Sequence, residues 1–319
     1  MRMDPEVKLL NETIINGLTS GNEALRKQAQ EGVDSWLRLK VREDGFARKI
    51  LPPVPVTPAD LDRQVDTPKP VIVKDMEPSS AGAYSVPFGT TPMDHYIMGP
   101  RYRVMFDRIL SRRYTADVNN LLTYDMDIRQ ILNDFLLKDI MAEEDRKFML
   151  VADSIVGTVN TVDTALGACQ YITVGPMTRA SLSHARKGLA STNRHLNASV
   201  ALVNNVTIWD VVALGRDSIG GDLAEELLVN GFAERQIMGL KWAITIKTDL
   251  VADHELYMFA EPKYTGDFFV LDDVTISTKH EDYIIEFFAY ECIGSTIQNT
   301  ASVAKVKFTG SSVDWRTGV

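Results

Sequence analysis

The feature that most restricts the fold of this chain is a long amphipathic stretch at residues 127–157. Its apolar side chains recur at helical spacing on one expected face: Ile128, Leu132, Phe135, Leu136, Ile140, Phe148, Val151, Ala152 and Ile155. Asp127 followed by Gln130 forms a capping box at its start. At about 1.5 Å per residue, a helix of about thirty residues would be roughly 45 Å long. We therefore expect a spine along which other elements pack.

Well upstream of this helix, residues 51–70 are rich in proline and contain six of the thirteen prolines. Proline fixes φ and has no backbone donor, so we expect an extended connector without sheet pairing of its own. Two short amphipathic helices are expected upstream, with apolar stripes at Val7, Leu10, Ile14 and Leu18 and at Leu25, Ala29, Val33, Trp36 and Leu37. An extended segment cannot bury itself, so residues 1–70 are expected to contact mainly other protein chains.

A long projecting β-hairpin is predicted between residues 71 and 110. Residues 71–75 and 101–110 have strand patterns, and in the second Tyr102, Val104 and Phe106 alternate with other residues. Residues 76–100 between them are rich in Ser, Gly and Pro, which favour turns. A hairpin of this length would extend beyond its own domain.

Five arginines lie within residues 101–113, against the single acid Asp107: Arg101, Arg103, Arg108, Arg112 and Arg113. Three interpretations are open for this cluster: a solvated strand face, a contact with an acidic neighbouring chain, or direct contact with nucleic acid. Guanidinium groups suit the recognition of carboxylates at interfaces. Because the chain has a net charge of −9, we take these arginines as candidate residues for contact between subunits.

The rest of the chain predicts an α+β fold. Residues 178–230 alternate between helix and strand patterns. From residue 240 onward, strand patterns follow one another at 240–247, 255–262, 267–278, 282–294 and 302–308. This order favours an antiparallel sheet over the regular β-then-α alternation of a doubly wound enzyme.

The sequence offers little that would support catalysis. It has no G-x-S-x-G nucleophile elbow, and Cys169 and Cys292 each stand alone, as expected of buried thiols in a reducing compartment. The glycine-rich stretch 215–221 lacks the lysine of a phosphate-binding loop, and Asp222 directly follows it. We therefore expect no catalytic residue and no bound cofactor.

Metal binding is not expected either. The five histidines never fall at i, i+3 or i, i+4 spacing, and Met258 occupies the position where a zinc-protease motif starting at His254 needs its second histidine. The adjacent carboxylates of Glu143 and Glu144, like those of Asp272 and Asp273, point in different directions. Both pairs are expected in solvated surface or turns.

Composition sets further limits. At 319 residues with 45% hydrophobic and 24% charged residues, the chain has the size and balance of one to three globular domains. No apolar run approaches the roughly 18 residues of a membrane span, and the N-terminus lacks the apolar core of a signal peptide, so we expect synthesis in the cytoplasm. The acidic balance argues against a broad nucleic-acid-binding face, but not against a container whose acidic lining keeps packaged nucleic acid from adhering.

The order of these parts resembles the Hong Kong 97-type major capsid protein of tailed bacteriophages. In that family an N-terminal arm precedes a projecting hairpin (the E-loop), a spine helix, an axial domain and the strands of a peripheral domain. The stretches ELYMFAEP at 255–262, GDFFVL at 266–271 and FFAYECIG at 287–294 are also similar to phage capsid chains. The resemblance assigns residues 1–70 to the arm, 71–115 to the E-loop, 116–169 to the peripheral domain with the spine helix, 170–240 to the axial domain and 241–319 to peripheral and axial strands with the C-terminus.

The resemblance implies a structural subunit, not an enzyme, that self-assembles into hexamers and pentamers of an icosahedral virion enclosing double-stranded DNA. It implies contacts with itself and with portal, scaffolding and decoration proteins, no sequence-specific DNA binding and no membrane. Two alternatives stay open: an encapsulin-like nanocompartment shell protein and an unrecognised soluble enzyme.

The chain also departs from some members of that family. It has no long, highly charged N-terminal extension of the kind that serves as an internal scaffold. Near the expected hairpin tip, at Ser79, Ser80 and Gly82, there is no lysine beyond Lys74. We therefore expect no covalent cross-link between subunits.

Overall fold

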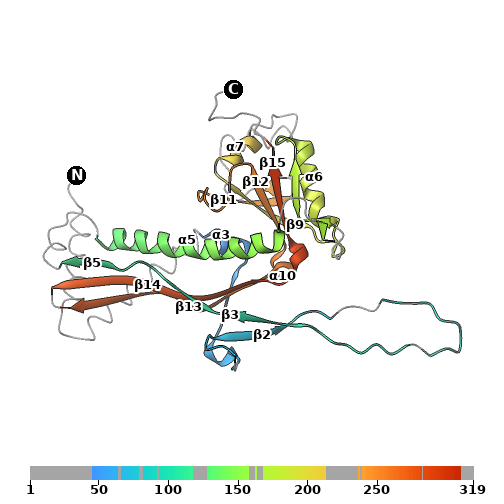
Figure 1. Ribbon diagram of the computed structural model, residues 1–319, viewed down its shortest axis with the longest axis horizontal. Coiled ribbons are helices and arrows are strands. Elements are labelled where there is room, and N and C mark those ends of the chain that lie inside the picture. The colour runs from blue at the N-terminus through green and yellow to red at the C-terminus, as the bar shows by residue number, and fades with distance from the viewer. Residues whose placement is uncertain are drawn as a thin grey trace.

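The computed structural model describes residues 45–63, 66–78, 82–91, 93–117, 128–157, 162–163, 168–212, 236–237, 239–281 and 283–309. Across these ranges one long helix and two larger sheets organise the chain, which confirms the α+β class (Figure 1). The helices expected before residue 45, the start of the long helix at Asp127 and the glycine-rich stretch 215–221 lie outside the described residues.

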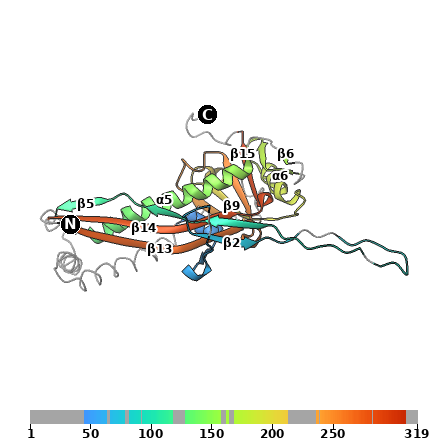
Figure 2. The ribbon, with the colours of Figure 1, turned by 60° about the horizontal axis from the view of Figure 1, so that its bottom comes forward.

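The predicted spine is present as α5 (Ile128–Val156), which lies along a five-stranded sheet (Figures 1 and 2). The sheet runs in the order β1 (Pro53–Pro55), β13 (Gly266–Glu281), β14 (Ile284–Ile297) and β4 (Asp107–Leu110), and β5 (Tyr114–Asp117) also pairs with β14. Because side chains alternate along a strand, one face of the sheet presents Ile276 and Ala289 to Leu136 and Ile140 of the helix. The helix and this sheet therefore form one elongated two-layer body.

A second sheet of six strands lies beside one end of α5 (Figure 1). Its order is β10 (Gln236–Ile237), β11 (Leu240–Thr245), β9 (Ala198–Asn204), β12 (Glu255–Ala260), β15 (Val303–Phe308) and β8 (Tyr171–Val174). The expected antiparallel pairing is confirmed for β12 with β9 and β15 and for β10 with β11, whereas β9 pairs with β11 and β15 with β8 in parallel, so the sheet is mixed. The chain leaves β9 through α7 (Thr207–Val212) before it reaches β11, and a crossover connection of this kind makes parallel pairing possible.

Both faces of the six-stranded sheet are covered. Leu256 and Met258 of β12 share a core with α6 (Arg179–Ala190) and α7, whereas Tyr257 and Phe259 share one with α5 and α3 (Phe46–Ile50). A strand with both faces buried needs apolar side chains at successive positions. This is why the sequence of β12 is almost continuously apolar. Short elements complete the described chain: β6 (Val162–Asp163) paired with β7 (Ala168–Cys169), α10 (Pro262–Thr265) and η2 (Thr300–Ser302).

The hairpin projects as predicted, and the strand pairing in its described residues lies at its base. β2 (Val71–Asp75) pairs antiparallel with β3 (Arg101–Met105), and the loop of residues 76–100 extends far beyond them (Figures 1 and 2). The strand expected at 101–110 is in fact two strands, β3 and β4, which belong to different sheets. They separate at Phe106, whose N–H donates to the carbonyl oxygen of Pro70 and whose side chain is buried.

Two expectations about the proline-rich arm are wrong for the part of it that the structure describes. Residues of α3 are buried in their own chain, together with α5 and β12. β1 pairs in parallel with β13, with Pro53 opposite Phe268, because an edge strand tolerates residues that lack an N–H. A short turn, η1 (Pro58–Asp60), follows and is closed by a capping box between Thr57 and Asp60. Residues 45–56 are thus anchored within their own subunit.

The buried face of α5 is shifted relative to the predicted one. Leu136 is 1% exposed, whereas the neighbouring Phe135 is 48% exposed and stacks on Tyr114 with ring centroids 6.0 Å apart. The buried stripe continues through Leu137, Ile140, Phe148, Met149, Ala152 and Val156. Either Phe135 or Leu137 could flank Leu136 on an amphipathic helix, and packing against the five-stranded sheet favours Leu137.

Candidate contact surfaces

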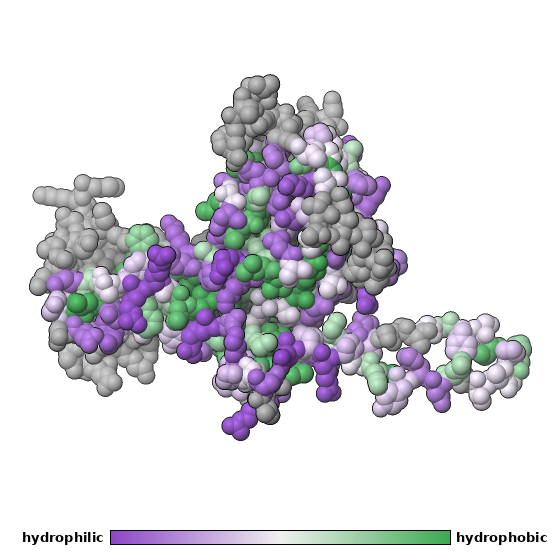
Figure 3. Space-filling view, in the orientation of Figure 1, coloured by the Kyte–Doolittle hydropathy of each residue, from purple (hydrophilic) through white to green (hydrophobic). Residues whose placement is uncertain are grey.

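The loop of residues 76–100 exposes an unusual number of large apolar side chains. Seven of them are exposed along its described length: Tyr84, Val86, Phe88, Met93, Tyr96, Ile97 and Met98. Figure 3 shows green, hydrophobic areas along the projecting loop. Exposed apolar side chains gathered in one place mark a surface that another molecule covers.

The tip of the loop is a tight turn that presents Phe88. The N–H of Thr90 donates to the carbonyl oxygen of Pro87, and Gly89 has a φ of 87°. A type II turn requires a positive φ at its third residue, which glycine adopts without steric cost. Phe88 therefore occupies the second position of the turn and its ring is fully exposed.

Two of the five candidate arginines lie at the base of this hairpin. Arg101 Nε donates to Asp75 Oδ1 at 2.8 Å, and Arg103 pairs with Asp66. The hydrogen bond from Arg103 lowers the pKa of Asp66. These side chains are largely exposed, and each arginine already has a carboxylate partner in its own chain.

Two further arginines lie on the face of the five-stranded sheet that points away from α5. Tyr290 of β14 is directly opposite Leu110 of β4, and Phe288 lies two residues away on the same face. Arg108 lies over the Tyr290 ring at 5.9 Å, and Arg113 lies over the Phe288 ring at 5.4 Å. We call these five residues the arginine–aromatic face.

Aromatic rings and cations reinforce one another on this face. The rings of Phe288 and Tyr290 are 6.4 Å apart, and a cation over an aromatic ring is attracted by the ring quadrupole. Arg113 also pairs with Glu286 at 3.3 Å. The face combines exposed apolar area, from Leu110 above all, with positive charge.

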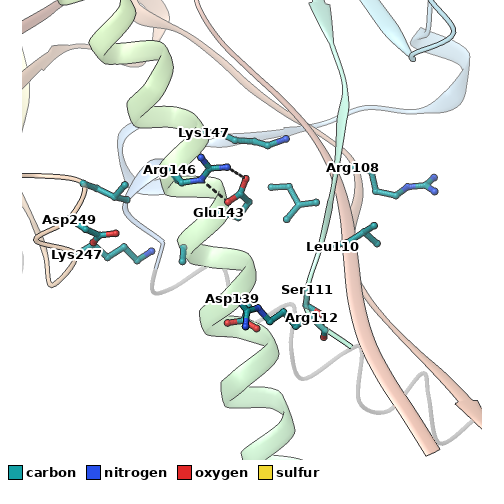
Figure 4. Close-up of a pocket in the computed structure, with 13 residues that line it drawn as sticks. Arg108, Leu110, Ser111, Arg112, Asp139, Glu143, Arg146, Lys147, Lys247 and Asp249 are labelled. Carbon is teal, nitrogen blue, oxygen red and sulfur yellow. Dashed lines mark hydrogen bonds and ion pairs between the residues drawn. The ribbon is translucent and has the colours of Figure 1, made fainter. Parts of the chain in front are cut away.

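The fifth arginine, Arg112, lines a cavity of about 510 Å³ on the opposite side, between α5 and β4 (Figure 4). The charged residues of its lining are Arg108, Arg112, Asp139, Glu143, Arg146, Lys147, Lys247 and Asp249. Arg108 lies at its edge and extends over Tyr290 on the other face of the sheet; of the other seven, four are basic and three are acidic. Arg146 and Glu143 neutralise each other at 2.6 Å.

The structure thus divides the five arginines among three places: the hairpin base, the arginine–aromatic face and the cavity beside α5. Sequence reasoning predicted one continuous strand at 101–110 that carries Arg101, Arg103 and Arg108, and the break at Phe106 divides this strand into β3 and β4. It also missed the apolar loop surface. The signal was present, since residues 76–100 contain eight large apolar residues among turn formers and no lysine or arginine.

Sequence reasoning also missed a buried ionic cluster beneath α5. Arg48 of α3 is buried with two carboxylates, and its Nη2 lies 2.6 Å from Glu144 Oε1 and 3.1 Å from Glu291 Oε2. The expectation that Glu144 lies in solvated surface is wrong, because α3 covers it. No pattern signalled this, since an amphipathic helix gives the same sequence whether a charge at its margin is solvated or paired.

The described residues offer few groups suited to other chemistry. Within them, no group of three or more His, Cys, Asp or Glu side chains could hold a metal ion. Cys292 is buried as expected, and burial together with Asp272 raises the pKa of its thiol, which disfavours the reactive thiolate. The side chain of Cys169 lies outside the described residues. None of the helices in the described ranges has the length and apolar character that crossing a bilayer requires.

Comparison with solved structures identifies the fold. The chain is similar to the capsid of a native GTA particle, with 14% identity, a TM-score of 0.55, and coverage of 82% of this chain and 89% of that one. It is also similar to the capsid of Cyanophage P-SCSP1u, at 12% identity and a TM-score of 0.54 over 78% and 86% of the two chains. A virus-like particle from Pyrococcus furiosus gives 13% identity and a TM-score of 0.50 over 87% and 98%.

No protein-family model matches the sequence, and no curated protein is similar to it. The structural similarity establishes the fold. At sequence identities this low, the function has to be argued from the surfaces of the chain. The chain has the Hong Kong 97-type capsid fold, as the order of its parts implied.

Proposed function

We propose that this chain is the major capsid protein of a tailed-phage-like particle, a subunit that joins copies of itself into a closed icosahedral shell. One observation carries the proposal: the loop of residues 76–100 projects from its own subunit and leaves seven large apolar side chains exposed. A two-limbed loop with a turn at its tip is only marginally stable in isolation and becomes ordered when it packs on a neighbouring subunit. A second copy of the chain is the partner that a shell supplies at every joint.

The arginine–aromatic face is suited to receive this loop from the second copy. The loop contains Glu77 and Asp94 and no lysine or arginine, whereas the face carries Arg108 and Arg113 beside exposed Leu110. Apolar contacts would then supply most of the affinity, and opposite charges would set the register. The aromatic residues at the loop suit such a contact, since aromatic and arginine side chains are enriched in interface centres.

The other arginines fit the same proposal as secondary contacts. Arg101 and Arg103 already pair within their own chain, so an acidic residue of a neighbour would share or exchange a partner there. Arg112 lines a cavity that could accept a carboxylate from an adjacent subunit. Exposed ion pairs contribute only about 0–1 kcal/mol each, and repetition around a ring multiplies the contribution.

The proposal extends to the particle as a whole. Hexamers and pentamers of the chain would enclose double-stranded DNA in a virion, without sequence-specific contacts. Portal, scaffolding and decoration proteins would be its partners. The acidic balance of −9 suits a lining that does not hold packaged DNA tightly. The chain would be structural and would catalyse no reaction.

A nanocompartment shell is the second candidate function. It is favoured by one observation, the similarity to a virus-like particle from Pyrococcus furiosus over 98% of that chain. A nanocompartment would enclose protein cargo, whereas a phage head would enclose nucleic acid.

Expression of the full chain, followed by size exclusion and negative-stain electron microscopy, tests the proposal. We expect closed shells, and chains that stay monomeric at every concentration and salt tested would contradict it. The contents then separate the two candidates. Nuclease-protected nucleic acid supports the phage head, and a single co-purifying protein inside small uniform shells supports the nanocompartment.

A further inference from the structure

The buried cluster around Arg48 joins the arm to the rest of the subunit. Arg48 lies on α3, Glu144 on α5 and Glu291 on β14, and all three are buried. Arg48 Nε and Nη2 both donate to Glu144, at 3.0 and 2.6 Å, and Nη2 also reaches Glu291 Oε2 at 3.1 Å. These contacts link elements that are far apart in sequence, so the cluster anchors residues 46–50 to α5 and β14. We call this anchoring cluster the clasp.

The cluster contains more carboxylates than its cations neutralise. Facing one another are Arg48 from α3, Glu144 and Asp145 from α5, Asp273 from β13, Glu291 from β14, and Lys247 after β11. Lys247 forms an ion pair with Asp145 at 2.6 Å. Arg48 is the cation that contacts Glu144, Glu291 and, at 3.6 Å, Asp273. Four carboxylates thus face two cations in this cluster, and Glu144 and Glu291 both depend on Arg48.

Glu291 is the least stabilised carboxylate of this cluster in its ionised form. Its Oε1 atom is buried and has no hydrogen-bond partner among the described residues, and its side chain is fully buried. Burial, followed by the neighbouring Glu144 carboxylate, raises the pKa of Glu291 well above its usual range, and Arg48 opposes this only in part. Two carboxylates that share one cation in a buried site are most stable when one of them carries a proton.

A route for that proton lies beside the cluster. A cavity of about 530 Å³ is lined by Arg48, Asp273 and residues of the proline-rich connector. Through this cavity, solvent can reach the edge of the clasp and exchange protons with it.

We propose that the buried Glu291 carboxyl carries a proton beside Glu144, and that loss of this proton loosens the attachment of residues 46–56 to the spine helix and the sheet. The arm then has a proton-dependent anchor, firm at mildly acidic pH and weaker at alkaline pH. The sign follows from linkage. Folded Glu291 holds its proton more tightly than an unfolded glutamic acid does, so the clasp loses stability as the pH rises from about 4.5 to the folded pKa. This device does not depend on the proposed function.

Hydrogen exchange of the full-length chain between pH 5 and pH 9 tests the proposal. The relevant amides are those of Ala47, which donates to Asp145, and Leu51, which donates to Ala47. After correction for the intrinsic exchange rate, protection of a peptide covering residues 45–52 should fall about tenfold or more, the effect of one pKa unit at a single site. Peptides from β12 and β15 should show no such fall.

Glu291→Gln removes the titration and should flatten this pH dependence. Glu286→Gln, on the same strand but outside the cluster, is the matched control and should keep it. Because changes at a buried site can impair folding, Glu144→Gln provides a second neutral variant with the same expected result. The proposal is overturned if protection in the unmodified chain does not change with pH, or if either folded variant keeps the original slope.

Discussion

The loop of residues 76–100 and strand β12 are both rich in apolar side chains, and the structure treats them in opposite ways. All six residues of β12 are buried, between β9 and β15 and beneath helices on both faces. The loop exposes seven large apolar side chains and contacts little beyond its own two limbs. The two regions differ in whether other elements of the same chain cover their apolar side chains.

This difference separates stability from association. Apolar area that folding removes from water contributes roughly 25 cal/mol per Å² to the stability of the subunit. The exposed area on the loop contributes to the subunit only when a second molecule covers it. Substitutions in the two regions should therefore affect different measurements.

The largest effect is expected in the six-stranded sheet. Phe259→Ala removes a fully buried ring and should lower the free energy of unfolding by about 3–5 kcal/mol. Phe88→Ala, at the exposed loop tip, should change it by less than about 0.5 kcal/mol. Urea titrations of the unassembled subunit measure both, and similar losses for the two variants would break the comparison.

The same contrast should hold between neighbours on one helix. Leu136→Ala should cost about 2–5 kcal/mol, since the side chain is buried against the sheet. Phe135→Ala should cost only about 0.5–1.5 kcal/mol, the value of its stack on Tyr114. Denaturant titrations again give the answer, and a larger loss for Phe135 would mean that the described face of α5 is wrong.

The smallest effect is expected at the hairpin base. Arg101→Gln breaks an exposed ion pair with Asp75 and should change the unfolding free energy by about 0–1 kcal/mol, less at high salt. Main-chain pairing between β2 and β3 holds the base without it. A loss above about 2 kcal/mol, measured at low salt by thermal unfolding, would show that the ion pair stabilises the hairpin.

Much of the fold could be predicted because it depends on periodicity. The 3.6-residue pattern located the C-terminal end of α5 to within one residue, and period-two patterns located β13, β14 and β15. The buried pairing of Arg48 with Glu144 and Glu291 could not be predicted, since it joins residues 96 and 243 positions away from Arg48 in the sequence. The parallel pairing of β1 was missed because proline content alone does not exclude an edge strand. The arginine cluster was visible in the sequence, but its division between two sheets depends on the break at Phe106.

The most direct test of the central claim separates folding of the subunit from its assembly. The double variant Phe88→Ser, Tyr96→Ser removes the two most exposed Phe and Tyr rings of the loop, and Tyr283→Ser removes an exposed ring at the turn between β13 and β14 as a control. Both proteins are compared with the unmodified chain by urea titration and by electron microscopy of the purified product. We predict that the double variant unfolds at the same urea concentration as the unmodified chain but forms no closed shells, whereas Tyr283→Ser still forms them. Normal shell formation by the double variant would contradict the account.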